Sequence, residues 1–140
     1  MFEIIYKENT AKHDDIILHL KSCDMQFMEE LFARVNPDQY VAKILTNASL
    51  HEAWHGDRLI GLLAVYKNDQ YYFITNVSIS QDFVKRGIAS SLIEGCIKNR
   101  GQNEVRLEVS KTNDAAANLY KKFGFVEIRQ DDKSNYLVLK

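Results

Sequence analysis

The stretch that decides the fold is NVSISQDFVKRGIASSLI, Asn76 to Ile93, which reads as a strand, a loop and a helix. We expect the helix to begin at about Ile88, where the first turn leaves backbone N–H groups free at the positive end of the helix dipole. Gly87 permits close approach of the backbone, and small residues follow it: Ala89, Ser90 and Ser91. Lys85 and Arg86 add positive charge. The stretch therefore predicts a site for a phosphate or pyrophosphate, although a helix with solvated basic residues at its start would look the same.

A second informative stretch is NDAAANLYKKFGF, Asn113 to Phe125. Asn113 is a suitable N-cap and Gly124 a suitable C-terminal residue for a short helix. Taken alone, this is an ordinary amphipathic helix whose apolar residues pack on a sheet.

Together, in this order and separated by one strand, the two stretches resemble the acyl-CoA-binding segments of the GNAT superfamily of N-acetyltransferases. The family's loop pattern, [Q/R]-x-x-G-x-[G/A], is matched by VKRGIA, Val84 to Ala89. Its later pattern, N-x-x-A-x-x-L-Y-x-x-x-G-F, is matched by Asn113, Ala116, Leu119, Tyr120, Gly124 and Phe125. Val84 replaces the usual Gln or Arg, but that position contributes mainly through its backbone N–H. SQD replaces the usual proline after the preceding strand.

The flanking sequence predicts the remaining elements. Strands are expected at Phe2–Glu8, in the hairpin from Leu50, at Tyr71–Ser80, at Val105–Ser110, and in FVEIRQ and NYLVLK. Helical spacing covers residues 16–23, and residues 27–45 form one bent helix or two short ones. The order is β-α-α-β-β-β-α-β-α-β-β, which is also the family's order. It corresponds to an α/β fold with a mixed, mostly antiparallel sheet of about seven strands, flanked by helices.

One motif points elsewhere. HEAWH, His51 to His55, matches the zinc-peptidase pattern, which requires both His on one helix face. The surrounding residues instead have the period of a strand, in which these His lie about 13 Å apart. We therefore expect a strand here, no metal site and no peptidase.

Composition sets the broad class. The chain has 140 residues, and we expect one domain over 1–140. A net charge of −1 gives no electrostatic reason to expect nucleic acid or an anionic membrane as a partner. Two cysteines are too few for a disulfide framework, and neither a signal-peptide layout nor a membrane-spanning apolar run is present. The expected location is the cytoplasm.

The resemblance also implies where acetyl-CoA binds. The strands through Val77 and Glu108 should start paired and then diverge, so that pantetheine lies between them like an extra strand on the backbone of Val77 and Ile79. The amides of residues 84–90 should hold the pyrophosphate. The expected cofactor-binding residues are Val77, Ser78, Ile79, Val84, Lys85, Arg86, Gly87, Ile88, Ala89, Ser90, Asn113, Ala116 and Tyr120.

The implied reaction is direct transfer of acetyl from acetyl-CoA to a primary amine. Glu108 is the candidate base that removes the amine proton, directly or through water. The Val77 N–H is the implied donor to the carbonyl oxygen, and Tyr120 the acid for the departing thiolate. A solvent-facing role for Glu108 and a packing role for Tyr120 are the alternatives. A non-catalytic acyl-CoA sensor of the same fold is the alternative function.

The acceptor pocket is expected around residues 27–40, but the sequence does not choose among an aminosugar, an amino acid, a polyamine and a protein N-terminus. Candidate lining residues are Met25, Phe27, Met28, Phe32, Trp54 and Tyr72, and candidate acids are Glu29, Glu30 and Asp38. NYLVLK is a candidate strand for pairing in a homodimer.

Overall fold

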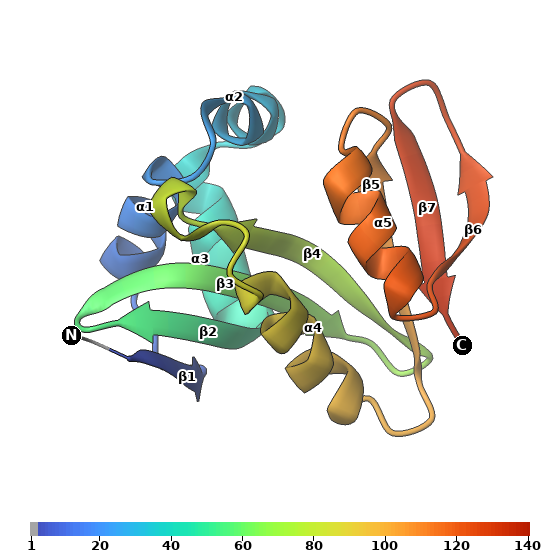
Figure 1. Ribbon diagram of the computed structural model, residues 1–140, viewed down its shortest axis with the longest axis horizontal. Helices are drawn as coiled ribbons and strands as arrows, with labels where there is room; N and C mark the ends of the chain where they lie inside the picture. The colour runs from blue at the N-terminus through green and yellow to red at the C-terminus, as the bar shows by residue number, and fades with distance from the viewer. Residues whose placement is uncertain (1–2) are drawn as a thin grey trace.

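The computed structural model describes residues 3–140, with Gln26 and Phe27 described only in their backbone (Figure 1). In chain order the elements are β1 (Ile4–Glu8), α1 (His13–Lys21), α2 (Met25–Arg34), α3 (Pro37–Asn47), β2 (Ser49–His55), β3 (Arg58–Lys67), β4 (Tyr71–Ile79), the 3₁₀ turn η1 (Gln81–Phe83), α4 (Ile88–Lys98), β5 (Glu104–Ser110), α5 (Asp114–Lys122), β6 (Val126–Gln130) and β7 (Ser134–Leu139).

The strands form one sheet in the order β1-β2-β3-β4-β5-β7-β6. Only β4 and β5 pair in parallel, and the other neighbours are antiparallel. The α4 helix joins the parallel pair, as a crossover connection requires. The predicted fold class, a mixed and mostly antiparallel seven-stranded sheet flanked by helices, is confirmed.

Helices cover both faces of the sheet, with α4 and α5 on the near side in Figure 1 and α1 and α3 on the other. The run LIGLLAV in β3 serves both layers. Leu62 packs into the cluster beneath α1 and α3, whereas Leu63 packs into the cluster beneath α4. Because successive side chains of a strand point to opposite faces, a central strand covered on both sides is apolar throughout.

The helical region before β2 contains separate helices α2 and α3, which resolves the open choice between one bent helix and two. Asn36 caps α3, since its Oδ1 accepts from the Gln39 N–H at 3.0 Å. Pro37 is the first residue of α3, where its missing N–H costs nothing. With α1, three helices precede β2, one more than the expected order counted.

The strands β4 and β5 pair only at their beginnings. Their register runs from Tyr71 opposite Glu104 to Ile74 opposite Leu107, and then stops. The pairing of β4 with β3 shifts register at the same point, leaving Thr75 as the extra residue of a bulge. A bulge bends its strand and increases its twist. The rest of β4 therefore turns away from β5, as Figure 1 shows, and the predicted divergence is observed.

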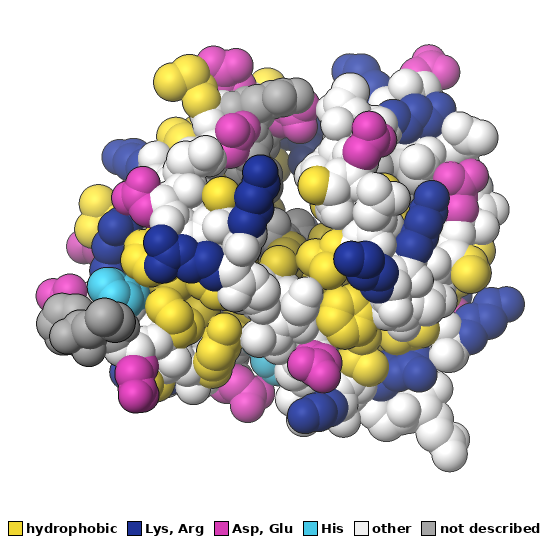
Figure 2. Space-filling model, viewed as in Figure 1, with side chains coloured by type: hydrophobic (Ala, Val, Ile, Leu, Met, Phe, Trp, Pro, Cys, Tyr) yellow, Lys and Arg dark blue, Asp and Glu magenta, His cyan; other side chains and the backbone are white. Residues whose placement is uncertain are grey.

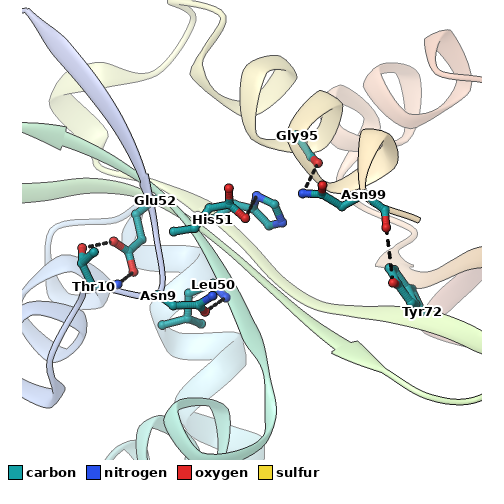
Figure 3. A network of polar contacts seen from close by, with 9 residues as sticks. Asn9, Thr10, Leu50, His51, Glu52, Tyr72, Gly95 and Asn99 are labelled. Carbon is teal, nitrogen blue, oxygen red and sulfur yellow. Dashed lines mark hydrogen bonds and ion pairs between the residues drawn. The ribbon is translucent and has the colours of Figure 1, made fainter. Parts of the chain in front are cut away.

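The HEAWH segment lies in β2, as predicted (Figure 3). His51 and Glu52 point to opposite sides of the strand. The Glu52 carboxylate is fully buried and accepts hydrogen bonds from the N–H groups of Thr10 and Ala11, both at 2.9 Å, and from Trp54 Nε1 at 3.0 Å. The Glu of this motif thus anchors the segment that leads into α1.

The expectation that NYLVLK offers a free edge is wrong. β7 lies between β5 and β6 and is paired on both sides, so its backbone groups are already used. The outer strand at this end is β6, whose residues are all exposed. A homodimer formed by strand pairing would use an outer strand, β6 at this end or β1 at the other, and dimerisation itself stays a prediction.

Candidate functional site

A cavity of about 520 Å³ lies where β4 and β5 separate. Figure 2 shows a hollow between the two halves of the molecule, with hydrophobic side chains at its bottom and Lys or Arg side chains on both sides. Its walls are Thr75 to Ile79 of β4 and Leu107 to Ser110 of β5. Residues from α2, the α4 loop and α5 complete the lining.

The open edge of β4 presents backbone hydrogen-bonding groups to this cavity. The Ser80 N–H donates to the Ile60 carbonyl at 2.8 Å, so Ser80 directs its backbone toward β3. Backbone groups of successive strand residues point alternately to the two edges. Val77 and Ile79 therefore direct their N–H and C=O groups toward the diverging β5, where an extended ligand can pair with them.

The α4 helix begins at Ile88, as expected, after Gly87 with φ of +81°. The first helical hydrogen bond is from the Ser91 N–H to the Gly87 carbonyl, at 3.1 Å. The N–H groups of residues 88–90 lie in the first turn and have no helical acceptor. Lys85 and Arg86 are exposed beside this turn, with the Arg86 guanidinium 5.0 Å from the Phe83 ring. The arrangement suits a phosphate or pyrophosphate group.

The start of α5 forms the opposite wall. Asn113 Oδ1 accepts from the Ala116 N–H at 3.2 Å and so caps the helix, as expected from its position. Asn113, Ala116 and Leu119 line the cavity. Gly124, with φ of +97°, follows the last turn and directs the chain into β6.

Tyr120 of α5 also lines the cavity. Its ring is buried and packs edge-on against Phe125, with 5.7 Å between ring centroids. Among the residues described, the Tyr120 hydroxyl has no hydrogen-bond partner. It is not one of the fully buried, unpaired polar atoms, so we place the hydroxyl at the cavity surface. Burial raises the pKa of the Tyr120 phenol far above its usual value. The phenol therefore stays protonated and is available as a hydrogen-bond donor.

Glu108 lines the cavity from β5. Its side chain is exposed, whereas its neighbours Leu107 and Val109 are buried on the other face. Across the strand pair it lies opposite Tyr136 of β7. The carboxylate is thus in contact with both the cavity and solvent.

The structure brings together most of the predicted cofactor residues. The cavity is lined by Val77, Ser78, Ile79, Val84, Ala89, Asn113, Ala116 and Tyr120. Lys85, Arg86, Gly87, Ile88 and Ser90 are not part of its lining. Ile88 is buried in the core, so its side chain cannot contact a ligand and only its N–H is available.

The expected acceptor residues are largely elsewhere. Trp54 is buried beneath α1 and α3, and the Tyr72 hydroxyl donates to the Asn99 carbonyl at 3.3 Å. Met25 is exposed, and neither Met28 nor Phe32 lines the cavity. The Phe27 side chain lies outside the described residues. Of the three acids, Glu30 lines the cavity, Glu29 does not, and Asp38 lies 3.4 Å from His13 Nε2.

Several lining residues were missed from the sequence: Cys23, Asp24, Leu31, Arg34, Asn76, Ser110 and Thr112. Cys23 and Asp24 lie between α1 and α2, and Leu31 and Arg34 lie in α2, so this half of the cavity is distinct from the half lined by α4 and α5. Burial raises the pKa of the Cys23 thiol to about 12, which keeps it protonated. Asn76 had a signal that was not used, since Asn is uncommon inside strands.

Comparison with known proteins adds an independent line of support. Residues 15–125 match the Acetyltransferase (GNAT) family. The chain belongs to this family. Over 108 residues it is 25% identical to N-alpha-acetyltransferase 30 of Schizosaccharomyces pombe, covering 75% of this chain and 63% of that protein. The chain thus spans less than two thirds of the length of this relative.

Solved structures confirm the fold. PaiA N-acetyltransferase from Thermoplasma acidophilum, in complex with coenzyme A, superposes with a TM-score of 0.82 at 14% identity, covering 99% of both chains. NAA60 of Arabidopsis thaliana, in complex with a bisubstrate analogue, has a TM-score of 0.75 at 19% identity, covering 98% of this chain and 97% of that one.

Proposed function

We propose that this chain, as one domain, transfers an acetyl group from acetyl-CoA to a primary amine by direct attack in a ternary complex. The observation that carries the proposal is the divergence of β4 from β5 after Ile74, next to the free N–H groups at the start of α4. An unpaired strand edge and a helix N-terminus fit an extended pantetheine chain followed by a pyrophosphate. Membership of the GNAT family supports the same donor.

We further propose an α-amine of a peptide as the acceptor. An α-amino group has a pKa of about 7.7–8.0, so roughly a tenth is neutral at pH 7, against less than about a thousandth of a lysine-type amine. Such an acceptor needs only modest help from a base, which suits an exposed Glu108. The relative from S. pombe is named as an N-alpha-acetyltransferase, which supports this choice.

The side chains divide the chemistry between them. Glu108 takes the amine proton through a water molecule, because an exposed carboxylate is in contact with solvent. The Val77 N–H donates to the acetyl oxygen as negative charge develops there. Tyr120 donates a hydrogen bond to the sulfur as the C–S bond breaks. Its proton completes the free thiol, and the phenolate takes a proton from water in the cavity. Nothing in these steps calls for a metal.

The chemistry also suggests the setting. Cys23 and Cys96 are both free and buried, which fits a reducing compartment, and we propose the cytoplasm. Among the described residues, no helix has the length and apolar character needed to cross a bilayer. The near-neutral charge supports neither a nucleic acid nor an anionic membrane as partner.

Two measurements test the proposal. Calorimetry with acetyl-CoA should show one site per chain, and the absence of binding at millimolar ligand would rule out the donor. Free-thiol release should then be measured with an Ala-initiated tetrapeptide, its N-formylated form, spermidine and glucosamine. We expect release with the free peptide and none with the blocked one. Binding without release for any amine would favour the alternative, a non-catalytic acyl-CoA sensor.

A further inference from the structure

The half of the cavity nearest α1 and α2 has a polar wall built on β4. Asn76 and Ser78 line it, although both are only 5% exposed. Behind them lies His19 of α1, which is 2% exposed. The Thr75 bulge explains why this wall is polar: Ile74 and Val77 pack into the same cluster beneath α4 although they are three residues apart. Asn76 and Ser78 are thereby directed to the α1 side.

Hydrogen bonds connect the three side chains in a row. His19 Nδ1 lies 3.1 Å from the Leu59 carbonyl oxygen, and His19 Nε2 lies 2.9 Å from Ser78 Oγ. Ser78 Oγ lies 2.8 Å from Asn76 Oδ1. The oxygen and nitrogen of a side-chain amide exchange places by a half-turn, so the order of protons along the row decides which end faces Ser78.

The proton order follows from the Leu59 end. A carbonyl oxygen only accepts, so His19 Nδ1 must carry a proton. Burial lowers the pKa of His19 to about 4, so the ring is neutral near pH 7 and Nε2 is bare. Ser78 must then donate its one proton to Nε2. Cys23 Sγ, at 3.7 Å from Nε2, is a much weaker competitor. Ser78 Oγ is left as an acceptor, so the Asn76 NH₂ group must face it.

The carbonyl end of Asn76 consequently points away from Ser78. The second amide atom of Asn76 has no hydrogen-bond partner among the described residues. The one fully buried side-chain atom without a partner in that part of the chain is Asn135 Oδ1, so this atom of Asn76 must be accessible from the cavity. Asn76 is also the residue before Val77, whose N–H we assign to the acetyl oxygen. Adjacent Cα atoms are about 3.8 Å apart, and both residues line the cavity, so the Asn76 side chain lies next to the proposed acetyl position.

We propose that Asn76 Oδ1 binds the amine nitrogen of the acceptor, and that Ser78 and His19 are positioning residues that hold the Asn76 amide in this orientation. A hydrogen bond to Oδ1 directs one N–H of the amine away from the thioester and leaves its lone pair facing the carbonyl carbon. The proposal deepens the proposed function and depends on it, because it names the residue that recognises the amine.

The test separates acceptor binding from donor binding. With the Ala-initiated tetrapeptide as probe, Asn76→Ala should raise the acceptor KM, and its Kd measured by calorimetry on the CoA-saturated protein, about tenfold or more. The acetyl-CoA Kd should stay within about twofold of the wild type. Ser78→Ala should raise the acceptor KM by a smaller factor, and Ser78→Thr, which keeps the hydroxyl, should restore it.

Ser22→Ala is the matched control, because Ser22 Oγ bonds Ser80 Oγ and the backbone carbonyl of His19, both at 2.6 Å, but bonds none of the three side chains of the row. It should leave the acceptor KM unchanged. An Asn76→Ala protein with normal acetyl-CoA binding and normal acceptor KM would overturn the inference and leave the proposed function standing. A wild-type protein that turns over no amine would overturn both.

A second measurement reads the proton order directly. Nitrogen-15 NMR of His19 at pH 7 should show a protonated Nδ1 and a bare Nε2. A proton on Nε2 would make Ser78 donate to Asn76 and turn the amide NH₂ toward the cavity, which contradicts the proposal. The NMR measurement does not depend on turnover. A purely structural role of the three side chains would not require this particular position of the His19 proton.

Discussion

Gly61 of β3 supports the start of α4, and replacing it should disturb the phosphate-binding turn from beneath. A Cβ at Gly61 would lie 2.9 Å from Ile88 Cγ2, 3.2 Å from Ala53 Cβ and 3.3 Å from Ile79 Cδ1. Carbon atoms prefer about 3.5–4.0 Å, so Gly61→Ala overpacks the core. We expect a loss of about 1–3 kcal/mol in the free energy of unfolding.

The strain should be relieved by movement of Ile88, which is only 3% exposed and is the first residue of α4. Gly61→Ala should therefore also weaken acetyl-CoA binding, by roughly tenfold if one phosphate hydrogen bond is lost. Ile88→Ala alone should cost about 2–5 kcal/mol through the cavity it leaves. In the double variant the new methyl group fills part of that cavity. The loss in unfolding free energy of the double variant should therefore be smaller than the sum of the two single-variant losses, by about 1 kcal/mol or more.

Urea denaturation of the four proteins gives the coupling, and calorimetry gives acetyl-CoA binding. Gly95→Ala is the matched control: it is also a Gly→Ala change, made within α4, with its Cβ 3.3 Å from His51 Nδ1 but far along the helix from the first turn. It should leave acetyl-CoA binding unchanged. Costs that add within about 0.5 kcal/mol would refute the contact between Gly61 and Ile88 as the source of the effect.

Three further predictions concern individual side chains. Tyr120→Phe should lower kcat by about 100-fold with little change in acetyl-CoA binding, and normal turnover on the true acceptor would remove its role as acid. Glu108→Gln should lower the rate most at low pH, where the amine is least often neutral, so an unchanged pH–rate profile would transfer the base role to bulk water. Neutral His19 should make stability depend on pH: its folded pKa of about 4 lies below the unfolded value of 6.5 because of burial, so the unfolded chain takes up the proton first as the pH falls. The contribution of His19 to the unfolding free energy, about 3 kcal/mol, is complete above about pH 6.5 and is lost toward pH 4. Burial also lowers the pKa of His51, which therefore acts in the same direction. His19→Gln should reduce the slope of the unfolding free energy against pH and leave the part that comes from His51.

Much of the fold could be predicted because the deciding signals are local. Periodicity identified the strands and α4, and Asn113 marked a helix start through a cap that involves neighbouring residues. The HEAWH segment was predicted to be a strand from its neighbours alone.

The half of the cavity that we propose for the acceptor could not be predicted in the same way, because it depends on contacts between distant segments. His19 and Asn76 are 57 positions apart in the sequence, and only the fold brings them together. The Thr75 bulge, which directs Asn76 toward α1, leaves no clear mark in the sequence. Trp54 and Tyr72 were proposed as lining residues on their chemistry, but the sheet places both elsewhere.

The central claim is that acetyl-CoA binds between the diverging strands, and a crystal structure with the bound ligand tests it most directly. We predict pantetheine hydrogen-bonded to the backbone of Val77 and Ile79, the pyrophosphate on the amides of residues 84–90, and the thioester between Tyr120 and Asn76. Density for the ligand at another surface, or a β4 that stays paired with β5 beyond Ile74 when the ligand is bound, would contradict the account.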